Sequence, residues 1–207
     1  MKILHIDCSL REGSHSRQLS AAVVARLLLD NPAAAITHRD LGRYPLPHTG
    51  ADYAAALSSP SATAAGQANG AMQLSETLLN EVESADVIVI GTPMNNFTVP
   101  SVLKAWIDQI LRMGRTIGVT ESGKKIGLMQ DKSVYVAIAS GGVFTGARAN
   151  QPDFLIPYMT AALGCVGLTS IQFLPLQATA FLDDGQLAEN REALLAILKS
   201  PLVADVR

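Results

Sequence analysis

Apolar positions form two kinds of pattern along the chain, and the two kinds alternate. Five short segments are nearly continuous runs of Ile, Val and Leu, which is typical of parallel strands covered on both faces. They lie at residues 2–7, 35–40, 86–91, 133–140 and 170–175. Apolar residues recur at helical spacing over residues 16–29, 71–83, 101–113, 152–163 and 190–199. This alternation predicts a doubly wound α/β fold, in which helices cover both faces of a five-stranded parallel sheet.

Two stretches fit neither pattern. Residues 42–70 contain several prolines among Ala, Ser and Gly, which predicts an extended surface segment with one short helix around residues 52–57. Residues 114–131 place glycines and lysines between a helix and a strand. We expect them to form a long loop or a small hairpin at the carboxyl edge of the sheet.

Length and composition limit the classes of function. With 207 residues the chain can bury one core, so we expect a single domain over residues 1–207. A net charge of −2 leaves no basic excess for a nucleic-acid partner, which points to a small ligand. No apolar run approaches the ~20 residues that span a bilayer, and Met1-Lys2 leads directly into a strand. We therefore expect a cytoplasmic protein without a membrane partner.

Cysteine and histidine positions give no sign of a metal site. Cys8 and Cys165 are far apart and lack a C-x-x-C partner, so we expect neither a disulfide framework nor a thiolate site. The histidines show no i, i+4 pairing and no acidic cluster beside them in the sequence; they are His5, His15, His38 and His48. Because this excludes the usual zinc spacings, we expect no metal.

The first strand ends in a loop rich in hydroxyl groups, which runs from Cys8 to Ser16 and leads into a helix. Hydroxyls, unpaired amides and the positive end of the helix dipole meet there, although neither the G-x-G-x-x-G nor the G-x-x-x-x-G-K-[ST] motif is present. These features predict a phosphate site at Ser9, Ser14, His15 and Ser16, with His15 offering its backbone N–H. In the alternative interpretation, Ser14 or Ser16 only caps the helix.

The loop after the third strand contains Met94, Asn95, Asn96 and Phe97. In a sheet of order 2-1-3-4-5 the ligand crevice lies between strands one and three, so this loop faces the first one. Met94 and Phe97 supply apolar surface for a flat ring, and the two asparagine amides can bond along a heterocycle edge. The alternative is a simple turn at the asparagines, with Phe97 packed in the core.

The fourth strand ends in Ala139, Ser140, Gly141 and Gly142. Consecutive glycines let the backbone approach a ring closely and point N–H groups at it. Alone, this pair could equally be a plain turn. The convergence of three loops on one sheet edge makes a shared ligand the stronger interpretation.

Together, the three loops resemble those of the FMN-dependent NADH-azoreductase family, which is close to the NAD(P)H:quinone oxidoreductases. The similarity covers nearly the whole chain and rests on two motifs, S-x-x-x-x-S-x-S after the first strand and P-M-x-N-F after the third. Further matches are Leu103-Lys104, Pro157-Tyr158, Leu163-Gly164 and Gly167-Leu168.

The resemblance implies a flavodoxin-like fold with bound FMN, NADH or NADPH as the hydride donor, and a quinone or azo compound as acceptor. It implies ping-pong turnover and a homodimer with active sites at the interface. By position, Ser9, Ser14, His15 and Ser16 would hold the phosphate, while Met94 to Phe97 and Ala139 to Gly142 would hold the isoalloxazine. Because the cofactor performs the redox step, we expect no catalytic side chain.

The chain also departs from the family pattern. The family often has Ser-Arg-Gly-Gly where this chain has Ala139-Ser140-Gly141-Gly142, and relatives place aromatic residues at the positions of Val119 and Ala162. Two alternatives remain open: an NAD(P)H:FMN reductase of the same fold, and a flavodoxin-like electron carrier. Such carriers are usually strongly acidic, whereas this chain is nearly neutral.

Overall fold

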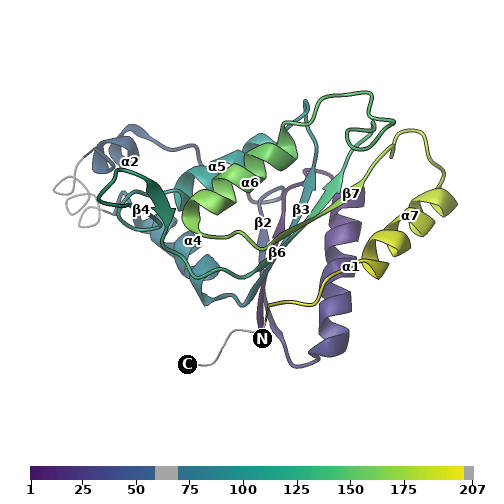
Figure 1. Cartoon of the computed structure of the whole chain (residues 1–207), viewed down its shortest axis with the longest axis horizontal. Coiled ribbons are helices and arrows are strands. Elements are labelled where there is room, and N and C mark those ends of the chain that lie inside the picture. The colour runs from purple at the N-terminus through teal and green to yellow at the C-terminus, as the bar shows by residue number, and fades with distance from the viewer. Residues whose placement is uncertain (59–69, 203–207) are drawn as a thin grey trace.

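A five-stranded parallel sheet forms the centre of the computed structural model, which describes residues 1–58 and 70–202 (Figure 1). The strand order is β2-β1-β3-β6-β7, which has the pattern of the expected order 2-1-3-4-5. The numbers differ because β4 (Ile117–Val119) and β5 (Lys125–Gly127) form a separate antiparallel pair. The sheet strands are β1 (Lys2–Asp7), β2 (Ala35–Asp40), β3 (Val87–Pro93), β6 (Ser133–Ala139) and β7 (Ile171–Leu176).

Helices cover both faces of the sheet, as the alternating pattern predicts (Figure 1). On one face lie α1 (His15–Asp30) and α7 (Asp184–Ala196). On the other lie α4 (Gln73–Ser84), α5 (Ser101–Ile110) and α6 (Leu155–Val166). Strands β3 and β6 are buried along almost their whole length, because both of their faces meet helices. By contrast, β2 is an edge strand with mostly exposed residues.

Two helices begin at other residues than expected, and in both cases a side chain bonds to the backbone at the start of the helix. Helix α7 begins at Asp184, six residues before the predicted start at 190, because Asp183 and Gln186 form a capping box. Helix α6 begins at Leu155 rather than at 152, since Asp153 Oδ1 accepts the N–H groups of Leu155 and Ile156. The predicted short helix is present as α2 (Ala51–Ala56). The rest of that expected segment, residues 59–69, lies outside the described residues.

The hairpin of β4 and β5 is present, but its expected place at the carboxyl edge of the sheet is wrong. Gly127 packs against Gly167, which directly follows α6 and precedes β7, and Met129 N–H donates to Val166 O. Helix α5 runs back across the sheet from the end of β3, so it delivers the chain to the amino edge before β6 begins. Among the described residues, no helix combines the length and hydropathy that crossing a bilayer requires.

Candidate functional site

A cavity of about 550 Å³ opens at the carboxyl edge of the sheet, between the ends of β1 and β3. All three loops selected from the sequence contribute to it. The expected residues in its lining are Ser9, Ser14, His15, Ser16, Met94, Asn95, Ala139 and Gly141. Four expected residues do not line it: Asn96, Phe97, Ser140 and Gly142.

The loop after β1 supplies the polar end of the cavity. Ser14 caps α1, since its Oγ accepts the N–H of Arg17 at 3.3 Å, so the cap that the alternative interpretation expects is present. Ser16 is fully buried, and its Oγ lies 3.3 Å from Ser14 Oγ, its only hydrogen-bond partner in the described part of the chain. His15 Nδ1 is also buried and has no hydrogen-bond partner among residues 1–58 and 70–202. These unused polar atoms at the amino end of a 16-residue helix suit a phosphate.

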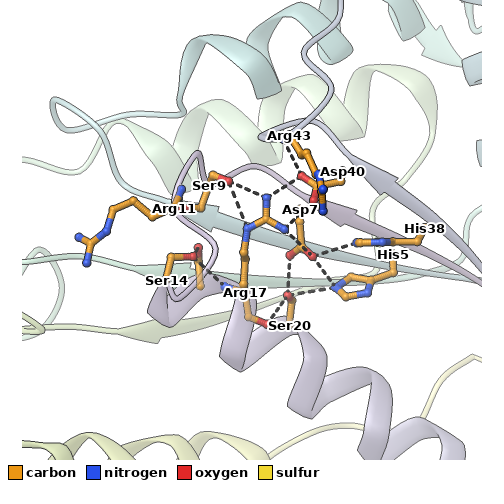
Figure 2. Close-up of polar contacts among 11 residues, drawn as sticks. His5, Asp7, Ser9, Arg11, Ser14, Arg17, Ser20, His38, Asp40 and Arg43 are labelled. Carbon is orange, nitrogen blue, oxygen red and sulfur yellow. Dashed lines mark hydrogen bonds and ion pairs between the residues drawn. The ribbon is translucent and has the colours of Figure 1, made fainter.

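Arg17 fixes this loop from behind. Its guanidinium donates to the Ser9 carbonyl at 2.7 and 3.2 Å and to the Asp40 carboxylate at 2.5 and 2.8 Å (Figure 2). The hydrogen bond with Asp40 raises the pKa of Arg17, and the same bond lowers the pKa of Asp40. Arg17 therefore joins the loop after β1 to the end of β2, and its charge is already paired with a carboxylate.

Gly42 is required at the same junction. A Cβ at this position would lie 1.9 Å from Ser9 O and 2.8 Å from Arg17 Nη2, so no other residue fits without moving the loop. Neither Gly42 nor the pair of Arg17 and Asp40 stood out in the sequence. Their contacts join segments that are distant along the chain, so no local motif reports them.

The loop after β3 makes a tight turn. Asn95 and Thr98 exchange backbone hydrogen bonds of 2.9 and 3.1 Å, and the φ angles of Asn96 and Phe97 are +48° and +70°. Asn96 and Phe97 therefore form the turn itself, and neither of them lines the cavity. The Phe97 side chain is 45% exposed, so the alternative of ordinary core packing is wrong for this residue.

Gln151 ties the loops after β3 and β6 together. Its Nε2 donates to Ser140 Oγ at 2.8 Å and lies 3.3 Å from Met94 Sδ. A Cβ on Gly142 would lie 2.6 Å from Gln151 Oε1. Ser140 and Gly142 thus contact Gln151 outside the cavity lining and support the cavity wall. No motif in the sequence marks Gln151, nor Thr179 and Ala180, which add a fourth segment to the lining.

Cys8 places a thiol in the cavity lining. Burial, aided by the nearby charge of Asp7, raises the pKa of its thiol well above the usual value. The thiol therefore stays protonated and does not act as a thiolate.

The two positions at which relatives are expected to place aromatic residues do not line this cavity. Ala162 is buried in α6 within the core, and Val119 lies on the exposed hairpin of β4 and β5 at the other edge of the sheet. Neither position therefore contributes to the cavity within a single chain.

Comparison with known proteins identifies relatives over nearly the full length. A model of the family described as flavodoxin-like fold matches residues 1–198. The chain is 42% identical to FMN-dependent NADH:quinone oxidoreductase 4 of Pseudomonas fluorescens, over 97% of this chain and 95% of the relative. It is 41% identical to FMN-dependent NADH:quinone oxidoreductase 5 of Burkholderia lata, over 94% and 95%.

Solved structures agree on the fold. The azoreductase of Bacillus anthracis superposes with a TM-score of 0.80 at 26% identity, covering 95% of each chain. An FMN-dependent NADH-azoreductase from the same species, solved in complex with FMN, gives a TM-score of 0.76 at 22% identity, over 94% of this chain and 96% of that one.

Proposed function

Since the chain belongs to the flavodoxin-like family of FMN-dependent NADH:quinone oxidoreductases, we propose that it reduces quinones and aromatic azo compounds by ping-pong turnover. It is an oxidoreductase that uses FMN and NADH. Bound FMN supplies the two-electron chemistry, because it can take a hydride from NADH and reduce an acceptor. The overall reaction converts NADH, a proton and a quinone to NAD⁺ and a hydroquinone. Cleavage of an azo bond to two amines consumes two NADH.

One observation supports the proposal most directly: unpaired polar atoms and apolar walls lie in the same cavity. At the polar end, the Ser14 and Ser16 hydroxyls and the first amides of α1 would bind the phosphate, on a loop held by Arg17. At the other end, Met94, Asn95, Ala139 and Gly141 would contact the isoalloxazine ring. The protein's own part is to bind and orient the cofactor and to keep water from one face of the ring.

The size of the cavity supports a mechanism in which the nicotinamide donor and the acceptor bind one after the other. A volume of about 550 Å³ suits one ligand of cofactor size. The nicotinamide donor and the acceptor would therefore share what remains of the mouth and enter in turn.

Initial rates measured over a matrix of NADH and menadione concentrations test this order. Ping-pong turnover gives parallel lines in double-reciprocal plots, whereas intersecting lines would contradict it. Methyl red as acceptor tests azo reduction. An electron carrier would show negligible NADH oxidation without a partner reductase, and an FMN reductase would require free FMN as its acceptor.

We also propose a homodimer, with the cavity mouths at the interface. Leu10, which lines the cavity, is 75% exposed, and Phe97 and Phe154 are exposed and joined by a backbone hydrogen bond. Exposed apolar side chains beside a cavity are typical of an interface, and a second copy would cover them. Sedimentation equilibrium should give twice the chain mass. A monomer at micromolar concentration would contradict this assignment.

We further propose that residues 1–207 form one domain, because hydrophobic clusters pack on both faces of one sheet. We also propose that the enzyme acts in the cytoplasm, where NADH is available. Limited proteolysis of the FMN-loaded protein should leave one resistant core rather than two separable fragments.

A further inference from the structure

A cluster of two histidines and an aspartate lies on the α1 face of the sheet, outside the cavity lining. Strands β1 and β2 pair in parallel with His5 opposite His38. Asp7 is two residues beyond His5, so its side chain lies on the same face. One nitrogen of each imidazole and one Asp7 oxygen lie within 4.8 Å of one another (Figure 2).

The spacing of the Asp7 carboxylate from each imidazole suits a metal ion. Asp7 Oδ2 lies 3.0 Å from His38 Nε2 and 3.5 Å from His5 Nε2. In a tetrahedral site with bonds of about 2.0–2.2 Å, ligand atoms are roughly 3.3 Å apart. Two imidazoles and one carboxylate are also donors that suit Zn²⁺ and related divalent transition metals.

Local charge and access favour a cation. Arg17 lies 3.5 Å from Asp7 Oδ2, but Asp40 already pairs with that guanidinium, so Asp7 adds a further negative charge to the cluster.

Ser20 Oγ donates to Asp7 Oδ1 at 2.8 Å, which leaves Oδ2 directed toward the histidines. The His38 side chain is 47% exposed on the edge strand, whereas that of Asp7 is 6% exposed. An ion can therefore reach the buried carboxylate from solvent past His38.

We propose that His5, Asp7 and His38 bind one divalent transition-metal ion. Solvent occupies the remaining coordination position, on the side of His38. The site is separate from the FMN cavity, so its occupancy does not depend on the proposed substrates. Arg17 links the two places, because it contacts both Asp7 and the Ser9 carbonyl.

Calorimetric titration of ZnCl₂ into FMN-loaded protein without a histidine tag tests the site. We expect saturation at one equivalent, and a loss of affinity of more than about tenfold in His38→Ala, because a direct ligand is removed. The matched control is His48→Ala, which removes an exposed histidine outside the cluster and should leave the affinity unchanged. No saturable binding, or equal affinity in wild type and His38→Ala, would overturn the proposal.

Two further variants exclude indirect explanations. His38→Phe keeps a ring beside His5, where the two imidazole centroids are 4.8 Å apart, and should lose zinc affinity as His38→Ala does. Retained affinity in His38→Phe would show that the loss in His38→Ala came from altered packing, and would overturn the assignment. Cys165→Ser should bind zinc normally; lost binding would assign the ion to the thiol instead.

Discussion

The junction between Arg17, Asp40 and Ser9 predicts a large effect from one substitution. Arg17→Met keeps most of the aliphatic stem but removes the four guanidinium hydrogen bonds to the Ser9 carbonyl and the Asp40 carboxylate. The side chains of Arg17 and Asp40 are 15% and 14% exposed, so Asp40 would keep its charge with little water to replace its partner.

Loss of one partner from a fully buried pair costs about 3–5 kcal/mol. Because water still reaches part of this pair, we expect a loss of ~2–3 kcal/mol in the free energy of unfolding. The freed loop should also bind FMN about tenfold more weakly, since the groups that we propose to bind the phosphate would no longer be held in place.

Urea denaturation of the FMN-free protein measures the first effect, and quenching of flavin fluorescence on titration measures the second. The matched control is Arg26→Met, which breaks an exposed i, i+4 pair with Asp30 at 3.7 Å and should cost less than ~0.5 kcal/mol. Arg17→Lys should recover only part of the loss, because an ammonium cannot reproduce the planar donor set. Equal stability of Arg17→Met and Arg26→Met would refute the reasoning.

Two other predictions concern the amino edge of the sheet. Gly127→Ala should lower the melting temperature strongly in a thermal scan, because its Cβ would lie 2.1 Å from Gly167 N. The helical control Gly164→Ala should be neutral or stabilising, because its Cβ would meet no described atom within 4 Å. Asp131→Asn should cost ~1–2 kcal/mol at pH 7. Although burial opposes it, hydrogen bonds from Thr169 and Ser170 lower the pKa of Asp131 to about 2 from 3.8. That stabilisation is complete above pH 3.8 and is lost as pH falls through about 2, so the difference in urea stability between wild type and variant should shrink there. Equal melting temperatures for Gly127→Ala and Gly164→Ala would contradict the first expectation. For Asp131→Asn, a difference in urea stability from wild type that stays constant from pH 7 to pH 2 would contradict the second.

Regular elements could be predicted because burial leaves a periodic trace in the sequence. The apolar runs of β3 and β6 follow directly from their place in the middle of the sheet. The loop after β1 could be selected because its hydroxyl groups are close together in the chain. Ser14 does cap the helix, as the alternative interpretation expects, and it also lines the polar end of the cavity.

Contacts between distant segments could not be predicted in the same way. The role of Gly42 depends on how closely the end of β2 approaches Ser9, and that distance leaves no local pattern. The pairing of His5 with His38 depends on the register of two parallel strands, whereas the usual metal motifs report spacing along one segment. The hairpin lies at the other edge than expected because α5 returns the chain across the sheet, and the glycines and lysines of residues 114–131 do not report that direction.

FMN affinity of Ser16→Ala tests the central claim, that the loop after β1 holds the cofactor phosphate. Ser16 suits the test better than Ser14, which also caps α1. The control is Ser75→Ala, which removes an equally buried hydroxyl that donates to Gln109 O, away from the cavity.

One hydrogen bond to a charged group contributes about 1.5–3 kcal/mol, so the dissociation constant of Ser16→Ala should rise roughly 10- to 150-fold. That of Ser75→Ala should match wild type. An unchanged FMN affinity in Ser16→Ala, measured on folded protein, would contradict the account.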